Sequence, residues 1–211
     1  AQTSRQRRLT AIEPELREQR GEIEAAVSHS LPQLVQRRDL RGDLHAHTLE
    51  SDGRDSLEAM AAGAPACGLE YLATTDHSPR LALAHGLDAS RLARQIDRID
   101  ELNARLEGIV LLKGIEVDIL EDGKLDLPDD VLRRLDLVVG AIHQRFDLSR
   151  SKQTDRLLRA MDHPCFSILA HPTARLINER RGCDFDLSRV IREARERGCF
   201  LELNAHPSRL D

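Results

Sequence analysis

The fold of this chain is decided at residues 43–48, which read Asp43-Leu44-His45-Ala46-His47-Thr48. The two histidines are one residue apart at the end of a short apolar run. Alternate residues of a β-strand share one face, so we expect His45 and His47 to point the same way. Two neutral imidazoles on one face make half of a metal site. The stretch therefore predicts a strand that ends in metal ligands.

Further apolar runs follow along the chain, and helical patterns separate most of them. Counting the first, the runs are at residues 40–44, 71–75, 110–119, 137–142, 167–170 and 199–203. Strands that alternate with helices are typical of an α/β fold with a parallel sheet and right-handed crossovers. Six strands fall short of the eight of a standard barrel. The sequence therefore predicts a small, distorted barrel or a chain that stops before its barrel closes.

Helix signals are clearest after residues 88 and 186. Asp88 and Asp186 can each cap a helix, and Gly198 is a typical C-terminal stop for the second. The first helix has an apolar face at Leu92, Ile96, Ile99, Leu102 and Leu106. The second is predicted to bury Leu187, Val190, Ile191 and Ala194. Residues 55–67 are a poorer helix, because Gly63 and Pro65 oppose its last turns.

Length and composition suit one large domain, or one domain with an appendage. Only 2% of the 211 residues are aromatic, so Leu, Ile, Val and Ala must supply the core. The formal charge of −5 gives no bulk attraction to nucleic acid or membrane, although bound divalent cations would reverse the local field. No apolar run approaches the ~20 residues that span a bilayer. Four widely spaced cysteines without a Cys-x-x-Cys pair predict reduced thiols and a cytoplasmic location.

The N-terminal part of the chain differs in pattern from the rest. Residues 14–27 are a charged helical stretch, which a break at Pro32 and the basic pair Arg37-Arg38 follow. We interpret residues 1–39 as a linker or the tail of a preceding domain, and residues 40–211 as the main domain. Because Ala1 is not Met and no signal-peptide core follows it, we expect a fragment or a processed product.

Candidate ligands recur near the ends of the predicted strands. They are His45, His47, Asp52, His77, Glu116, His143 and His171. Five successive strands carry a His or Glu at or near the carboxyl end, where α/β barrels build their active sites. One isolated histidine is more often a hydrogen-bonded surface or core residue, but five in one register favour a single site.

The ligand types limit the metal and its chemistry. Imidazole and carboxylate without thiolate suit zinc, manganese, iron or cobalt. Three His and one Glu satisfy one ion, so seven candidates predict two or three ions. Glu116 can bridge two of them, and such a cluster suits hydrolysis of phosphate esters. Since no Ser or Cys nucleophile has a convincing partner, we favour attack by water that the ions activate.

Cations on the same loops are candidates for substrate binding. Arg145, Arg175 and Arg209 follow the fourth, fifth and sixth strands, and a guanidinium can hold two phosphate oxygens. Each of them can equally be a solvated surface arginine. Asp43 and Asp76 are interpreted as residues that orient neighbouring histidines.

The combined motifs resemble those of the PHP (polymerase and histidinol phosphatase) superfamily. The matching segments are residues 43–48, 51–53, 75–78, 114–118, 141–143 and 170–173. Residues 14–26, 41–43, 116–120, 143–146 and 203–211 further resemble the branch in bacterial and archaeal family X DNA polymerases (PolX). Histidinol phosphatases and stand-alone PHP phosphatases share the metal motifs but are not expected to carry the segment at 14–26.

The resemblance implies a fold, an activity and a set of ligands. It implies a distorted (β/α)7 TIM-like barrel, here truncated after the sixth strand, with up to three manganese or zinc ions. It also implies a hydrolase, a 3′–5′ exonuclease that processes DNA 3′ ends in DNA repair, with DNA and an upstream polymerase domain as partners. By motif, His45, His47 and Glu116 would bind one ion. Glu116, His143 and His171 would bind a second, and Asp52 and His77 a third.

The resemblance also implies ligands that this chain does not contain. The family ends its site with an Asp-x-His pair after a seventh strand, and the chain stops at Asp211 before such a strand. We therefore expect 211 residues to bind fewer ions than the intact domain and to be weakly active or inactive. His206 stands where Gln or Asn is more usual, as a surface residue or a substitute ligand.

Two other functions stay open at this stage. A small-molecule phosphatase of the histidinol-phosphatase type would use the same ligands. A non-catalytic scaffold for the polymerase would not need seven ligands in register, so the ligand set argues against it.

Overall fold

The computed structural model describes residues 10–17 and 19–211. Its residues fall into two units, Ala1–Leu40 and Arg41–Asp211. The second unit contains the predicted strands and every candidate ligand. Among the described helices, none is both long and apolar enough to cross a membrane. All four cysteines are unpaired.

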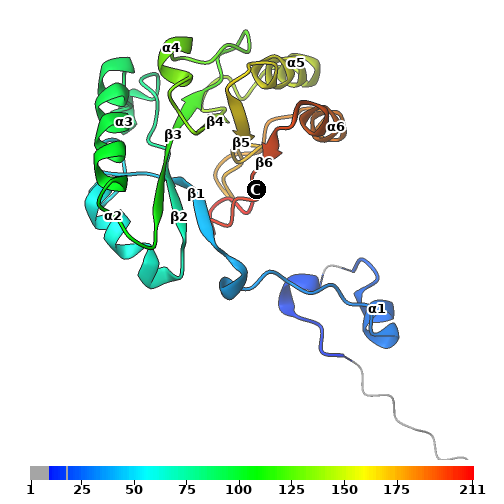
Figure 1. The fold of residues 1–211 in the computed structure, drawn as a ribbon. Helices are drawn as coiled ribbons and strands as arrows, with labels where there is room; N and C mark the ends of the chain where they lie inside the picture. Colours follow the sequence, from blue (N-terminus) through cyan, green and yellow to red (C-terminus); the bar gives the residue numbers. More distant parts are fainter. Residues whose placement is uncertain (1–9, 18) are drawn as a thin grey trace, which may run out of the picture. The chain divides into compact units, whose positions relative to one another are not determined.

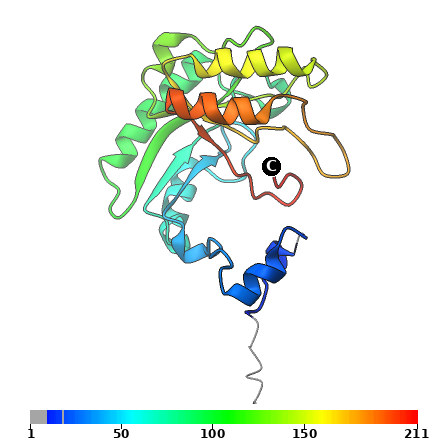
Figure 2. The ribbon, with the colours of Figure 1, turned by 90° about the vertical axis from the view of Figure 1, so that its right-hand side faces the viewer.

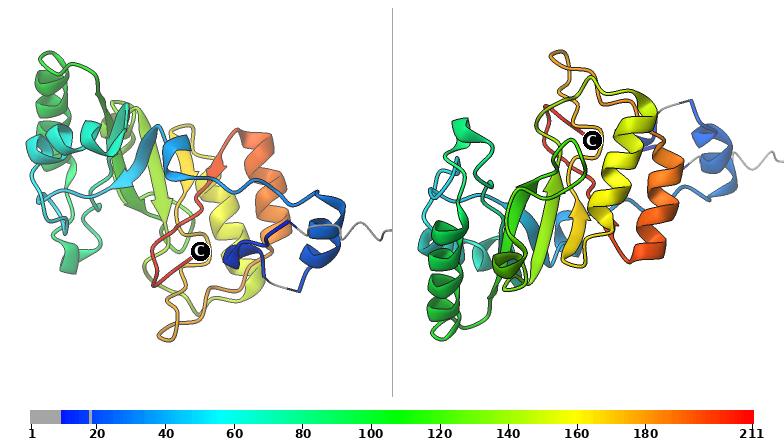
Figure 3. Two further views of the ribbon diagram at one scale, coloured as in Figure 1. Left: turned by 90° about the horizontal axis from the view of Figure 1, so that it is seen from below. Right: turned by 90° about the horizontal axis from the view of Figure 1, so that it is seen from above.

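The centre of the second unit is a six-stranded parallel sheet. Its strands are β1 (Gly42–Ala46), β2 (Tyr71–Thr74), β3 (Val110–Asp118), β4 (Leu137–Ala141), β5 (Phe166–Leu169) and β6 (Phe200–Leu201). Each strand pairs in parallel with the next, so the spatial order is the order of the chain. The sheet curls, and helices cover its outer side (Figures 1 and 3). The predicted α/β class and the six strands are confirmed.

Five α-helices accompany the sheet in this unit. They are α2 (Leu57–Gly63), α3 (Ala89–Asn103), α4 (Asp129–Leu132), α5 (Arg150–Met161) and α6 (Leu187–Arg197). The predicted caps are present, since Asp88 accepts a hydrogen bond from Arg91 N and Asp186 accepts one from Arg189 N. Gly198 ends α6 with φ at +72°. Helices α5 and α6 lie side by side (Figure 2).

Two details of the helical predictions are wrong. Leu106 lies beyond the end of α3, although it still packs against the core. On α6, Val190 and Ala194 are buried, but Leu187 and Ile191 are 44% and 49% exposed. Helix α6 packs against α5 and the two-residue strand β6, and Leu187 and Ile191 lie outside these contacts with the core.

The poor helix at residues 55–67 is two short pieces. Helix α2 begins after Ser56, whose hydroxyl accepts a hydrogen bond from Ala59 N. It ends at Gly63, and a 3-10 helix, Pro65–Cys67, follows. Pro65 occupies the first position of that turn, where its missing N–H is not needed. The change of helix type therefore accommodates both residues that oppose a longer α-helix.

The first unit contains less helix than the sequence predicts. A 3-10 helix at Pro14–Leu16 is separate from α1 (Glu22–Ser28), and a second 3-10 helix is at Arg37–Asp39. Gly21 precedes α1 with φ at +91°, a left-handed conformation that interrupts a continuous helix. The continuous helix expected over residues 14–27 is therefore wrong, and its residue Glu18 lies outside the described residues.

The core explains how the sheet presents its polar residues. Ile115 and Val117 of β3 are fully buried and pack in one cluster with Leu92 and Ile96 of α3. Alternate residues of a strand point to opposite faces, so Glu116 points away from this cluster to the inner side of the sheet. The apolar layer under the helices thereby fixes the direction of a buried carboxylate.

Candidate metal centre

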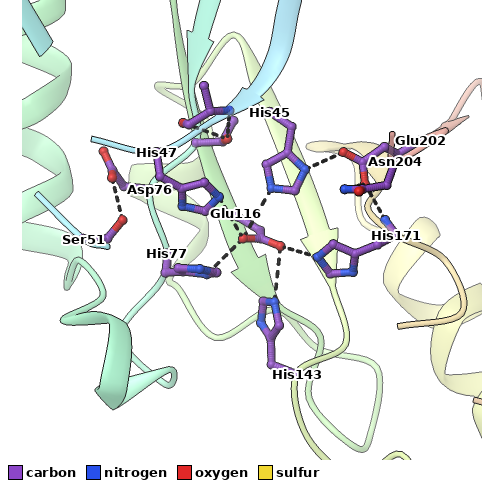
Figure 4. Close-up of polar contacts among 12 residues, drawn as sticks. His45, His47, Ser51, Asp76, His77, Glu116, His143, His171, Glu202 and Asn204 are labelled. Carbon is purple, nitrogen blue, oxygen red and sulfur yellow. Dashed lines mark hydrogen bonds and ion pairs between the residues drawn. The ribbon is translucent and has the colours of Figure 1, made fainter. Parts of the chain in front are cut away.

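Glu116 is the centre of a ring of histidines on the inner side of the sheet. Its side chain is 1% exposed. Five imidazole nitrogens face its two carboxylate oxygens (Figure 4): His45 Nε2 at 3.4 Å, His47 Nε2 at 3.5 Å, His77 Nδ1 at 2.9 Å, His143 Nε2 at 3.3 Å and His171 Nε2 at 2.9 Å. The first three face Oε2 and the last two face Oε1. The structure therefore brings all five histidines together around one carboxylate.

Strand register explains this convergence. His45 is in β1, and His47 follows the last residue of that strand. His77 comes shortly after β2 and forms an isolated parallel bridge with Glu116. His143 and His171 each lie two residues past the end of their strands, β4 and β5. Carboxyl ends of neighbouring parallel strands meet at one edge, so these residues share one site.

Three groups of side chains place their ligand atoms within 4.8 Å of one another. The groups are His45, His47 and Glu116; His47, Asp52 and His77; and His77, Glu116 and His143. The first is the set that the family resemblance implies for one ion. The second contains the implied pair Asp52 and His77. The third joins Glu116 and His143 with His77, while His171 faces Oε1 of Glu116, the oxygen that His143 also faces.

This donor set fits divalent metal ions better than it fits a hydrogen-bonded core. Two carboxylate oxygens cannot satisfy five imidazoles, and His47 Nδ1, His77 Nδ1 and His171 Nδ1 are buried without a hydrogen bond. His77 Nδ1 is close to Glu116 and His47 Nδ1 is 3.2 Å from Asp52 Oδ1, but neither pair is aligned as a hydrogen bond. Imidazole nitrogens and carboxylate oxygens are the ligands that zinc and manganese accept.

The metal-free ring holds both carboxylate charge and protons. Burial alone would raise the pKa of Glu116, but the nearby imidazole nitrogens of His143, His171, His45 and His77 hold that pKa well below its usual value. Burial likewise opposes a charge on His45, yet hydrogen bonds to Glu116 and Glu202 raise its pKa to about 10. For His143, hydrogen bonds to Asp118 and Glu116 outweigh burial and raise the pKa to about 9. For His47, burial dominates and lowers the pKa.

Two carboxylates that the sequence analysis did not assign support the ring from outside. His45 Nδ1 lies 2.6 Å from Glu202 Oε1. His143 Nδ1 is hydrogen-bonded to Asp118 Oδ1. Asp118 could have been found from its spacing, because it shares a strand face with Glu116 two residues earlier. Glu202 also lies at the carboxyl end of a predicted strand, the sixth, but its contact with His45 depends on the curl of the sheet.

The prediction that Asp76 orients a neighbouring histidine is wrong, whereas Asp43 does contact one. Asp76 is fully buried and accepts hydrogen bonds from Ser51, Gln95 and both the backbone and the hydroxyl of Thr48. It thus fixes the loop that carries Asp52, rather than a histidine ring. Asp43 accepts a hydrogen bond from the backbone N–H of His45, which agrees with its predicted contact to a neighbouring histidine.

The three arginines at the rim have different surroundings. Arg145 is half-exposed and lies 3.4 Å from Glu121 and 3.7 Å from Asp147. Arg175 is bonded to the backbone, with its Nε 2.7 Å from Arg209 O and its Nη2 on Leu210 O. Arg209 Nη1 in turn donates to Arg175 O at 3.3 Å. Of the three, only Arg145 has a guanidinium that is not committed to backbone oxygens.

His206 lies outside the ring. Its Nδ1 is 2.8 Å from Ser208 Oγ, and its side chain is exposed. None of the three groups of ligand atoms includes it.

Comparison with known proteins gives one family. The model described as the PHP domain matches residues 43–206. The DNA polymerase/3′-5′ exonuclease PolX of Bacillus subtilis is 44% identical over 203 residues, which are 96% of this chain and 35% of that protein. A probable phosphatase of Acetivibrio thermocellus is 32% identical over 168 residues, which are 78% of this chain and 65% of that protein.

Among solved structures, the histidinol phosphate phosphatase of Lactococcus lactis matches at a TM-score of 0.37 and 16% identity. That alignment covers 77% of this chain and 60% of the other. That protein was solved with zinc, L-histidinol and phosphate. The chain spans only about a third of the length of its PolX relative and less than two thirds of the other two. The family match covers all but one of the strands in full and every residue of the histidine ring, so this chain belongs to the PHP domain family.

Proposed function

We propose that this chain is a metal-dependent phosphoesterase that acts on DNA 3′ ends, as the PHP domain of a PolX-type protein. The observation that carries the proposal is the ring of five histidines around one buried carboxylate. The interior of a folded domain rarely places so many titratable side chains around one carboxylate unless they have a function. Manganese or zinc, in up to three positions, is the proposed cofactor.

Each part of the ring has a role in the proposed reaction. Bound there, divalent ions would supply Lewis acidity toward a phosphate oxygen and toward water. Glu116, His45, His47, Asp52, His77, His143 and His171 are the residues that would hold the ions. The buried position of Glu116 keeps its carboxylate away from solvent, which strengthens its interactions with cations. Arg145, whose guanidinium lies near Glu121 and Asp147, is the proposed partner of a substrate phosphate.

The extent of similarity favours the PolX branch. An alignment over 96% of the chain includes most of Ala1–Leu40 as well as the sheet. The phosphatase alignment covers 78% of the chain and is short enough to lie within Arg41–Asp211. This supports residues 1–39 as the segment that joins the PHP domain to an upstream polymerase domain in the parent protein. DNA and that polymerase domain are the proposed partners.

A small-molecule phosphatase is the second candidate, because a relative at 32% identity is named a probable phosphatase. The two candidates predict different products from the same metal centre. One would release nucleotides from a DNA 3′ end, and the other would release inorganic phosphate from a phosphomonoester.

The test compares these two products in manganese. The chain is incubated with 5′-labelled single-stranded DNA or with histidinol phosphate, and each reaction is repeated with Glu116→Gln. We expect weak shortening of the DNA from its 3′ end by the wild type and none by the variant. Glu107→Gln, an exposed and distant carboxylate, is the matched control and keeps the wild-type activity. Phosphate release from histidinol phosphate without DNA shortening would overturn the proposal.

A further inference from the structure

Glu202 links the two edges of the open sheet. Strands β1 and β6 are the first and last of the six, and neither pairs with the other. Glu202 directly follows β6, and its carboxylate reaches His45 in β1 (Figure 4). It is largely buried together with its partner, since both side chains are 14% exposed. A single side chain therefore spans the gap that the backbone hydrogen bonds leave.

Both oxygens of this carboxylate hold a residue of the histidine ring. Oε1 is 2.6 Å from His45 Nδ1, and because an ionised carboxylate can only accept, the ring nitrogen donates. Oε2 accepts the backbone N–H of His171 at 2.6 Å. Asn204 Nδ2 lies 3.2 Å from the same Oε2 and steadies it. Glu202 thus contacts one ligand through its ring and another through its backbone.

Each of these hydrogen bonds helps to direct a histidine nitrogen toward Glu116. A proton on His45 Nδ1 leaves the lone pair on Nε2, the atom that faces Glu116. His171 has φ at +23°, a sparsely populated backbone conformation for a residue with a side chain. The hydrogen bond to Glu202 stabilises this conformation, in which His171 Nε2 lies 2.9 Å from Glu116.

We propose that Glu202 is the positioning residue of this centre, which orients the His45 ring and the His171 backbone so that ligands from both ends of the sheet face Glu116. The inference rests on the proposed metal centre and deepens it. Asp118 provides an internal comparison, because it contacts His143 from β3 itself and does not cross between strands at the edges. Loss of Glu202, unlike loss of Asp118, would therefore remove the side-chain link between His45 in β1 and His171 after β5.

The test measures zinc affinity rather than activity. Zinc is titrated into the metal-free chain against a competing chelator for the wild type, Glu202→Gln, Glu202→Ala and Glu196→Gln. Carboxylates that orient a ligating histidine typically contribute about 10- to 100-fold to metal affinity. We expect a loss in that range for Glu202→Ala and a smaller loss for Glu202→Gln, whose amide oxygen can accept from only one of the two donors. Glu196, exposed on α6, is the matched control and is expected to leave the affinity unchanged.

A second readout separates positioning from general stability. Imidazole nitrogen NMR of the zinc-loaded wild type should show His45 protonated at Nδ1 and without a proton at Nε2, and this pattern should be lost or mixed in the Glu202 variants. Wild-type zinc affinity together with a wild-type His45 protonation pattern in Glu202→Ala would overturn the inference. If the alanine variant does not fold, the same two measurements on Glu202→Gln test the inference instead. Failure of the wild type itself to bind zinc would instead overturn the proposed metal centre.

Discussion

The inner ring of the site and its arginine rim are held in different ways. The five histidines lie in or next to parallel strands and surround a fully buried carboxylate. The rim arginines lie on loops, where the guanidinium groups of Arg175 and Arg209 donate hydrogen bonds to backbone oxygens. The hydrogen-bonded backbone of the sheet fixes the direction of side chains at strand ends. The direction of a side chain on a loop depends instead on which partner lies near it. The chemistry should therefore tolerate changes at the rim and not in the ring.

The largest effect is expected from Glu116→Gln in the ring. The amide keeps the volume of the side chain but removes the charge that five imidazoles share. We expect a loss of phosphoesterase activity of at least ~10²-fold, beyond the range typical of residues that only orient a ligand. Elemental analysis of the purified variant should show fewer ions per chain than the wild type. Wild-type metal content and activity would place the reaction away from Glu116.

The ring should also make metal binding depend on pH. The pKa values of His45 and His143 are raised to about 10 and about 9, so at neutral pH both rings are protonated in the metal-free protein. A metal must displace these protons, so its affinity should rise with pH by up to about tenfold per unit for each proton displaced. Titration calorimetry in buffers of different ionisation enthalpy counts the protons released. Equal affinities at about pH 6 and about pH 8 would contradict this.

The same shifts set the stability of the metal-free chain. The His45 pKa is raised, so its contribution is fully present below the unfolded value of 6.5 and is lost as the pH rises through about 10. Hydrogen bonds from His45 outweigh the burial of Glu202 and lower its pKa from 4.5 to about 2, so its contribution is present above 4.5 and lost as the pH falls through about 2. Urea unfolding at a series of pH values should show that the His45–Glu202 pair contributes most to the free energy of unfolding between pH 4.5 and pH 6.5.

The smallest effects are expected at the rim, and there the arginines should differ from one another. Arg145→Ala removes an exposed guanidinium and should raise the KM for single-stranded DNA by about fivefold, with unchanged metal content. Arg175→Ala should change KM by less than about twofold and lower the free energy of unfolding by about 1 kcal/mol, because it loses bonds to the backbone. Steady-state kinetics and urea unfolding of both variants check the contrast. The reverse pattern would make Arg175 the substrate contact.

The sequence allowed every member of the ring to be predicted, because these residues lie in the strands or shortly after them. A His or Glu after an apolar run needs only the strand end to be placed, and all six runs coincide with strands to within a few residues. Asp118 was within reach of the same reasoning through its spacing from Glu116. Its hydrogen bond to His143 depends on the pairing of β3 with β4, which parallel topology also predicts.

The residues that escaped prediction depend on contacts between distant segments. Glu202 meets His45 only because the sheet curls, and no local pattern encodes that curl. Leu187 and Ile191 fit an apolar helix face, but their exposure depends on which strands lie next to α6. Arg175 has the composition of a phosphate ligand, yet the backbone at Arg209 and Leu210 takes its donors. The hydrophobic periodicity of a sequence describes one helix or strand at a time, so it does not predict these contacts between distant segments.

Anomalous diffraction from crystals of this chain grown with manganese or zinc tests the central claim most directly. We expect anomalous difference peaks inside the ring, next to Glu116 and the five histidines, and their loss in crystals of Glu116→Gln. A ring without peaks at saturating metal, with the five imidazoles still packed around Glu116, would contradict a metal centre and leave a hydrogen-bonded polar core in its place.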